Sequence, residues 1–215
     1  MTIKHRYELV LRRFEEFAPA AETELVYDTP FHLLLAVILS AQCTDKRVNI
    51  VSPALFKAFP TPESLAAVTP DDVFPYIKSV SYPNNKAKLI VGAAKVLVEE
   101  FGSEMPSDID SLMKLPGVGR KTANVMMAVV FNKAAMAVDT HVFRVSERIG
   151  LTTGSRNPLQ TERALTRHIP PEIIPKAHHW LILHGRYICK ARRPDCLNCF
   201  LSDCCRYFND SSKDE

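Results

Sequence analysis

Four of the six cysteines of this 215-residue chain fall within its last 27 residues. Gaps of six, two and five residues separate them, and the four are Cys189, Cys196, Cys199 and Cys205. So short a segment leaves no room to pack apolar side chains between the thiols, so they are expected to surround one metal centre. The spacing therefore predicts that residues 189–205 form a loop built around that centre.

The same spacing ranks the kinds of centre. A structural zinc usually takes two short Cys-x2-Cys knuckles, and here only Cys196 and Cys199 form one, which favours an iron-sulfur cluster over zinc. Disulfides come last, because the charged N-terminal stretch 1–17 is no signal peptide and a reducing compartment is expected. Cys204 is an alternative to Cys205 as the fourth ligand, and Cys43 is interpreted as a small buried hydrophobe.

Apolar residues recur at helical spacings along most of the chain, for example at Tyr7, Val10 and Phe14. No stretch alternates over a strand length, and prolines and glycines separate the candidate helices. The predicted fold class is therefore all-α. Helices are expected at 3–17, 31–40, 46–59, 62–67, 70–79, 84–101, 110–114, 121–131, 139–149, 158–168 and 174–189. The polar tail 209–215 is expected to fray.

Composition limits the setting in which the chain works. It is 47% hydrophobic without a low-complexity tract, which predicts a folded, soluble protein with one good core or two modest ones. The apolar run 33–41 is too short to cross a bilayer. We therefore expect a cytoplasmic protein with no membrane span.

The positive charge is unevenly distributed. A formal net charge of +3 does not by itself indicate a nucleic-acid partner. However, the segment 111–138 contains four basic residues and no Asp or Glu, and the segment 186–206 contains five basic residues against two acidic ones. Two such segments suit a polyanionic partner.

The most specific local motif is the segment 115–123, which reads Leu-Pro-Gly-Val-Gly-Arg-Lys-Thr-Ala. A short helix before it, two glycines one residue apart and a new helix after it predict a helix-hairpin-helix. Gly117 and Gly119 allow backbone angles and close approaches that a side chain forbids, and the following helix N-terminus suits a phosphate. An ordinary glycine turn between packed helices is the alternative, which the flanking residues disfavour.

Lys121 and Asp139 are the candidate catalytic pair. Lys121 would lie at the start of a helix beside Arg120, where positive surroundings lower the pKa of an ammonium and favour the neutral amine that acts as a nucleophile. Asp139 is the first carboxylate after the acid-free segment and precedes a helix. It is also a candidate N-cap, with Thr140 as its competitor, and the capping and catalytic roles are compatible.

Four motifs follow one another along the chain in a known order: the stretch 39–45, the hairpin 115–123, the segment 138–144 and the cysteine ladder. Together they resemble the endonuclease III family, the iron-sulfur DNA glycosylases of the helix-hairpin-helix superfamily. The similarity runs from about residue 7 to residue 207. The resemblance implies two helical domains with DNA in the groove between them: a helical barrel at 22–133, and a cluster domain made of 1–21 and 134–215.

The resemblance also implies site roles. Lys121 matches the Schiff-base lysine, Asp139 the catalytic aspartate, and Gln42 the residue that enters the gap left by a flipped nucleotide. The four-cysteine ladder matches the ligands of a [4Fe-4S] cluster. The expected DNA contacts in the hairpin and the cluster loop are Gly117, Val118, Gly119, Arg120, Lys190, Arg192 and Arg193.

One segment departs from the family pattern. Before Asn-x-Lys-Ala the family commonly has a glycine, a bulky apolar wedge and a tyrosine, whereas this chain has Ser81, Tyr82 and Pro83. Tyr82 would stand at the wedge position, where an aromatic ring can stack between bases. The alternative is a turn residue before Pro83, and both interpretations stay open.

The lysine decides the expected activity within the family. Adenine-removing relatives usually lack a lysine at position 121 and carry an extra C-terminal domain, which favours a bifunctional glycosylase and AP lyase here. Its expected substrate is double-stranded DNA with oxidised pyrimidines or abasic sites, bound by a monomer at the nucleoid of a bacterium. A monofunctional glycosylase and a non-catalytic DNA-binding iron-sulfur protein are the alternatives.

Overall fold

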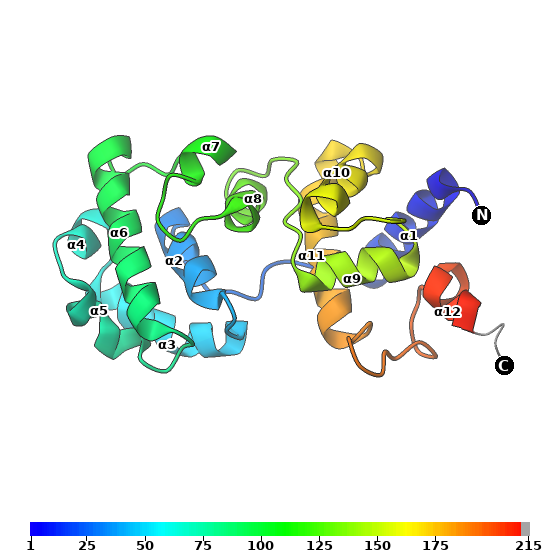
Figure 1. Cartoon of the computed structure of the whole chain (residues 1–215), viewed down its shortest axis with the longest axis horizontal. Coiled ribbons are helices and arrows are strands. Elements are labelled where there is room, and N and C mark those ends of the chain that lie inside the picture. The colour runs from blue at the N-terminus through cyan, green and yellow to red at the C-terminus, as the bar shows by residue number, and fades with distance from the viewer. Residues whose placement is uncertain (212–215) are drawn as a thin grey trace. The chain divides into compact units, whose positions relative to one another are not determined.

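The computed structural model describes residues 1–211, and every regular element in them is a helix (Figure 1). The predicted all-α class is confirmed. The chain divides into two compact units. Unit 1 combines Met1–Thr23 with Asn132–Glu215, and unit 2 is Glu24–Phe131. Across the described residues no helix is long and apolar enough to span a bilayer.

Unit 2 is built around one helix that is buried on all sides. Its elements are α2 (Pro30–Ser40), α3 (Asp45–Ala58), α4 (Pro62–Ala66), α5 (Pro70–Ile77), α6 (Pro83–Phe101), α7 (Ile109–Leu112) and α8 (Arg120–Val129). Every residue from 31 to 39 of α2 is buried, and α3, α6 and α8 all pack against it. The continuous apolar sequence of α2 thus makes it the central helix of this unit.

Three helices of unit 2 begin with the same Thr-Pro pair. Thr29, Thr61 and Thr69 are the N-caps of α2, α4 and α5, and each is followed by a proline in the first helical position. A threonine side chain can satisfy an amide of the first turn, and proline there gives up an amide that would have no partner in the helix. Local sequence therefore fixes where these helices start.

Unit 1 joins the first helix of the chain to its last third. Its elements are α1 (Ile3–Phe17), α9 (Thr140–Ile149), α10 (Pro158–His168), η1 (Pro171–Ile173), α11 (Ile174–Tyr187), η2 (Ser202–Cys204) and α12 (Arg206–Ser211). Phe14 of α1 stacks on Trp180 of α11, with ring centroids 5.5 Å apart and an interplanar angle of 6°. Helix α9 crosses α11 at Gly185, where an added Cβ would lie 2.8 Å from the Cβ of His141.

Most predicted helices have ends within one or two residues of those observed, and the tail differs more. The polar tail was expected to fray from residue 209, but Asn209–Ser211 belong to α12, where the amide of Asn209 donates to the carbonyl of Cys205 at 3.1 Å. That prediction is wrong for these three residues. Residues 212–215 lie outside the described residues.

Candidate functional site

The predicted hairpin lies between α7 and α8. The amide of Val118 closes the turn by donating to the carbonyl of Leu115 at 3.0 Å. Gly117 has a φ of +83°, and a Cβ there would lie 3.2 Å from Leu89 and 3.3 Å from Ile38. Both the backbone angle and the close packing therefore require glycine at this position.

Gly119 has a different environment from Gly117. It is the N-cap of α8 with a φ of −92°, which any residue can adopt, and a Cβ added to it would meet nothing within 4 Å. Neither strain nor packing inside the described protein calls for glycine here. The open space in front of Gly119 is where a ligand could approach the start of α8.

The predicted contacts of the hairpin separate into two groups. Gly119 and Arg120 are exposed, whereas Val118 is 6% exposed and its amide is used in the turn. The side chain and the amide of Val118 are thus engaged inside unit 2, and its contact with DNA stays a prediction.

Lys121 lies in the first turn of α8 and is exposed. The residues that follow it, 123–128, are all buried, so the helix is anchored in unit 2 and carries the lysine at its solvent-facing start. The hairpin thus sets the position of Lys121 through a rigid element, as a precise site requires.

Asp139 is the N-cap of α9, as predicted. Its Oδ1 atom accepts hydrogen bonds from the amides of His141 at 2.9 Å and Val142 at 2.8 Å, and Thr140 is the first helical residue. The side chain is half-buried behind the buried segment 135–138. Lys121 belongs to unit 2 and Asp139 to unit 1.

Gln42 and Tyr82 lie on two loops of unit 2 that contact each other. Both are exposed, and both have a positive φ, 52° for Gln42 and 53° for Tyr82. The hydroxyl of Ser81 donates to the carbonyl of Gln42 at 2.8 Å. Tyr82 is 65% exposed and is the N-cap of α6 directly before Pro83, so the wedge and turn interpretations both stay open.

The four ladder cysteines line a single small cavity in unit 1. Its lining also includes apolar side chains, among them Ile149, Ile188 and Leu201. Cys204 is absent from this lining; it is buried elsewhere, and its thiol donates to the carbonyl of Leu201 at 3.3 Å. Within residues 1–211 no group of three or more His, Cys, Asp or Glu side chains could hold a single metal ion.

Burial shapes the chemistry of these thiols. It raises the pKa of Cys199 to about 11 and also raises the pKa of Cys196 and of Cys205. The sulfur atoms nevertheless have donors nearby: the amide of Leu201 lies 3.4 Å from Cys199 Sγ, and Arg148 lies 3.6 Å from Cys189 Sγ. An apolar cavity with four thiols and N–H donors to sulfur fits an iron-sulfur cluster.

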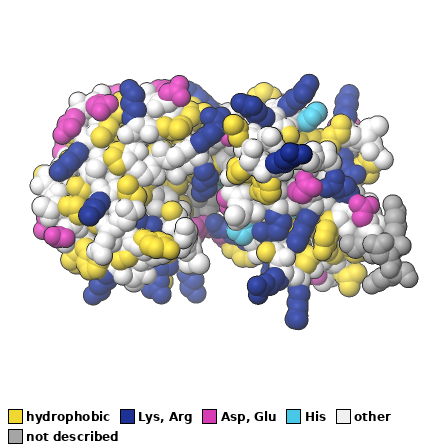
Figure 2. All heavy atoms as spheres, in the orientation of Figure 1, with side chains coloured by type: hydrophobic (Ala, Val, Ile, Leu, Met, Phe, Trp, Pro, Cys, Tyr) yellow, Lys and Arg dark blue, Asp and Glu magenta, His cyan; other side chains and the backbone are white. Residues whose placement is uncertain are grey.

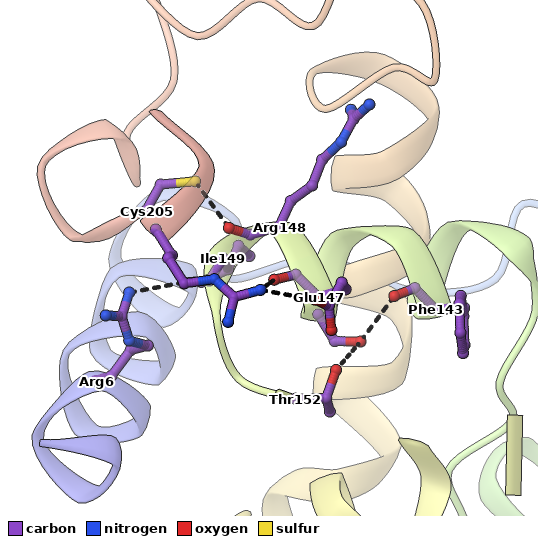
Figure 3. A network of polar contacts seen from close by, with 9 residues as sticks. Arg6, Phe143, Glu147, Arg148, Ile149, Thr152 and Cys205 are labelled. Atoms are coloured by element: carbon purple, nitrogen blue, oxygen red, sulfur yellow. Dashed lines mark hydrogen bonds and ion pairs between the residues drawn. The ribbon is translucent and has the colours of Figure 1, made fainter. Parts of the chain in front are cut away.

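Arginines from the helices hold the backbone around this cavity. Arg148 donates to the carbonyls of Lys190 at 2.7 Å and Ala191 at 3.1 Å, and Arg144 donates to that of Cys189 at 3.2 Å. In Figure 3 the thiol of Cys205 points to the carbonyl of Arg148, 3.4 Å away. The cluster loop is therefore fixed by α9 as well as by its own cysteines.

The basic residues of this loop face solvent. The side chains of Lys190, Arg192 and Arg193 are exposed, and Arg193 has a φ of 52°. Figure 2 shows Lys and Arg side chains spread over the viewed face of both units. A fixed backbone with exposed cations is suited to contacting a phosphate chain.

Sequence reasoning missed one buried lysine beside the Gln42 loop. Lys86 of α6 is 3% exposed and donates to one carbonyl at the end of α2 and one in the loop that follows it. It shares the buried stripe of α6 with Ile90, Ala93 and Leu97, at offsets of four, seven and eleven residues. A charge on the apolar stripe of a helix is the signal that could have revealed it.

Comparison with known proteins agrees with this fold. The family model described as "HhH-GPD superfamily base excision DNA repair protein" matches residues 35–171. Endonuclease III of Rickettsia felis is 47% identical over 205 residues, covering 94% of this chain and 96% of that protein. Endonuclease III of Bacillus subtilis is 47% identical over 199 residues, which cover 93% of this chain and 91% of that protein.

Solved structures give the same result. A trapped endonuclease III-DNA covalent intermediate matches with a TM-score of 0.92 and 42% identity, covering 99% of this chain and 100% of that one. A non-covalent endonuclease III-DNA complex matches with a TM-score of 0.93 at the same identity and coverage. The helical fold and the hairpin define the class, a base excision DNA repair protein of the HhH-GPD superfamily. Within that class the chain belongs to the endonuclease III family, and its activity is that of a DNA glycosylase and AP lyase.

Proposed function

We propose that this chain removes oxidised pyrimidines from double-stranded DNA and then nicks the strand at the abasic site, with Lys121 as the nucleophile and Asp139 as the catalytic carboxylate. The observation that carries the proposal is the exposed Lys121 in the first turn of α8, directly after a hairpin with open space at Gly119. This arrangement brings a backbone phosphate and an amine to the same helix end.

The hairpin supports phosphate binding through its backbone. The first amides of a helix lack partners within the helix, and its dipole favours an anion at this end. Without a Cβ at Gly119, a phosphate oxygen can approach the backbone closely. Arg120 adds a formal positive charge at the same place. The hairpin would thus anchor the strand that carries the lesion.

The chemistry follows from an amine next to an anchored strand. The damaged nucleotide must leave the stack, at a cost of a few kcal/mol. The neutral amine of Lys121 then attacks C1′ and the C1′–N bond to the base breaks, so that the base leaves and takes up a proton. The C1′–O4′ bond then opens, O4′ takes the proton that the amine loses, and an imine links the enzyme to the sugar. Loss of a proton from C2′ expels the 3′-phosphate by β-elimination. Asp139 stabilises positive charge on the sugar as the base departs.

Two further surfaces would hold the distorted duplex. Gln42 would fill the gap left by the flipped nucleotide, and the exposed ring of Tyr82 would stack between neighbouring bases. Lys190, Arg192 and Arg193 would contact phosphates, which makes binding weaken as the salt concentration rises.

The cysteine ladder would hold a [4Fe-4S] cluster through Cys189, Cys196, Cys199 and Cys205. When bound, the cluster would supply four iron–sulfur bonds that fix the loop. No step of base removal or strand cleavage passes through it. The support for this assignment is that all four thiols line one cavity and that two of the sulfurs have N–H donors.

We also propose that the enzyme works as a monomer in the cytoplasm of a bacterium, at the nucleoid. The support for a bacterial setting is that the relatives described above are bacterial.

Borohydride trapping tests the assignment of the lysine. Wild-type protein mixed with duplex DNA containing thymine glycol or an abasic site should form a covalent adduct that borohydride makes permanent, whereas Lys121→Ala should form none. Lys114→Ala is the matched control, because Lys114 is an exposed lysine just before the hairpin, and it should trap normally. An adduct with Lys121→Ala would overturn the role of Lys121.

The same reaction separates the alternatives. A monofunctional glycosylase would release the base without an adduct or a nick, and a non-catalytic DNA-binding protein would do neither.

A further inference from the structure

Lys86 is a buried cation whose three donors are all used. Its Nζ atom donates to the carbonyls of Leu39 and Ala41, both at 2.7 Å, and to the hydroxyl oxygen of Ser81 at 3.1 Å. An ammonium has three N–H groups, so this set is complete. The three acceptors come from the end of α2, the loop after it and the loop before α6.

Ser81 extends this network to the Gln42 loop. Its hydroxyl accepts from Lys86 and donates to the carbonyl of Gln42 at 2.8 Å. A chain of hydrogen bonds therefore runs from Lys86 through Ser81 to the backbone of Gln42. Tyr82 follows Ser81 directly in the sequence. The network of Lys86 and Ser81 therefore lies next to both Gln42 and Tyr82.

Both exposed residues of these loops have a strained backbone. Gln42 and Tyr82 have φ values of 52° and 53°, in the left-handed region that is unfavourable for a residue other than glycine. Backbone bonds support each one: Cys43 donates to the carbonyl of Ser40 at 3.0 Å, and the amide of Lys86 donates to that of Tyr82 at 3.1 Å. Strain of this kind persists only where the surroundings enforce it.

The buried charge is costly, and packing alone does not require it. Burial lowers the pKa of Lys86, with a smaller opposing effect from Cys43. An apolar side chain would fill the same volume without desolvating an ammonium. The ammonium adds three hydrogen bonds that hold the acceptor groups of the two loops in place. Its positive charge also suits the C-terminal end of α2.

We propose that Lys86 and Ser81 are positioning residues that lock the two loops into one conformation, so that Gln42 and Tyr82 enter a DNA duplex together as one wedge. This inference rests on the proposed function of the two exposed residues. Its consequence is that Gln42 and Tyr82 act as a coupled pair, although 40 positions separate them in the sequence.

The test measures insertion into DNA without chemistry. A duplex carrying a tetrahydrofuran abasic analogue opposite 2-aminopurine reports, by its fluorescence, when protein side chains enter the gap. Ser81→Ala should weaken insertion roughly fivefold, the effect of losing one hydrogen bond, with a melting temperature close to that of wild type. Ser81→Thr keeps a hydroxyl and should restore insertion.

Coupling gives the second readout. The loss caused by Ser81→Ala should shrink when Gln42 is already alanine, because residues of one network are not additive. Lys86→Met should abolish insertion, but it is also expected to lower stability, so the Ser81 variants carry the test. Wild-type insertion by Ser81→Ala, or additive effects of Ser81→Ala and Gln42→Ala, would overturn the inference.

Borohydride trapping in parallel keeps the two proposals distinguishable. If wild-type protein traps DNA but Ser81→Ala inserts as wild type does, only the positioning role fails. If wild-type protein neither traps nor inserts, the proposed function fails and the positioning role is overturned with it.

Discussion

The carboxylate of Asp139 accepts the amide of Val142 at 2.8 Å through Oδ1, and the amide of His141 bonds to the same oxygen. Both bonds use Oδ1, so capping of α9 engages one of the two carboxylate oxygens. This division lets a single side chain both stabilise the fold and take part in the proposed chemistry.

Substitution of Asp139 should separate the two roles. Asn and Ser are both good N-caps, so Asp139→Asn and Asp139→Ser should change the free energy of unfolding by less than about 0.5 kcal/mol. Both remove the carboxylate and should slow strand cleavage by roughly 100-fold or more. Urea denaturation and single-turnover cleavage of abasic DNA measure the two quantities.

Asp139→Ala is the control for capping, and it should cost about 1 kcal/mol of stability in addition to the loss of activity. Full cleavage activity in Asp139→Ser would contradict the catalytic role.

Substitutions of the two hairpin glycines should have different effects, one on stability and the other on DNA affinity. Gly117→Ala forces a side chain into a left-handed conformation against Leu89 and Ile38, so the free energy of unfolding should fall by about 1–2 kcal/mol. Gly119→Ser keeps a good N-cap and has open space, so stability should be unchanged while affinity for abasic DNA falls about tenfold, or 1.4 kcal/mol. Thermal unfolding and fluorescence anisotropy check both variants, and unchanged affinity in Gly119→Ser would contradict phosphate binding at this glycine.

Substitutions of Cys199 and Cys204 should differ in their effect on the iron content of the protein. Cys199 lines the cavity, whereas Cys204 bonds to the carbonyl of Leu201 away from it. Purified wild-type protein and Cys204→Ala should both be coloured and contain about four irons per chain. Cys199→Ala should lose most of that iron and its visible absorbance. Zinc in place of iron in the wild-type protein would refute the cluster assignment.

Stability should depend on pH through His179. Burial, with the positive charge of Arg186, lowers the pKa of His179 to about 4 from its usual 6.5. Between these two pH values the unfolded chain binds a proton that the folded chain does not. The contribution of His179 to the free energy of unfolding is therefore expected to be fully present above pH 6.5. It should fall by about 1–2 kcal/mol on going to pH 5.

Urea denaturation at pH 7 and pH 5 measures this change. His179→Gln should make the loss smaller, with the remainder due to His184, whose pKa is also lowered to about 4 by burial. An identical loss in His179→Gln and wild type would rule out His179 as the source.

Local patterns made most of the fold predictable. Helical periodicity identified α1 through α11, and Asp139 was recognised as a cap because a carboxylate before a helix has a specific partner in the first turn. The tail was harder, because α12 is short and polar, and tertiary contacts around Arg206 supply what its sequence lacks. One such contact is the ion pair of Arg206 with Glu147 at 2.7 Å.

Roles that depend on three-dimensional neighbours were less predictable. Val118 looked like part of a ligand-binding motif, but the turn directs its side chain into the core. Lys86 was missed because its backbone acceptors lie 45 and 47 positions away in the sequence. Spacing along a chain identifies residues of one element, whereas hydrogen bonds between distant loops are fixed by packing.

The composition of unit 1 has a consequence for synthesis on the ribosome. Unit 2 is a continuous segment, so it can fold as soon as residue 131 has left the exit tunnel. Helix α1 is made first but must wait, because Arg6 bonds to the carbonyl of Cys204 at 2.5 Å and Arg13 to that of Phe200 at 2.5 Å. The nascent chain therefore completes its lysine-bearing half before its cysteine-bearing half, and the proposed cluster could be inserted only near the end of translation.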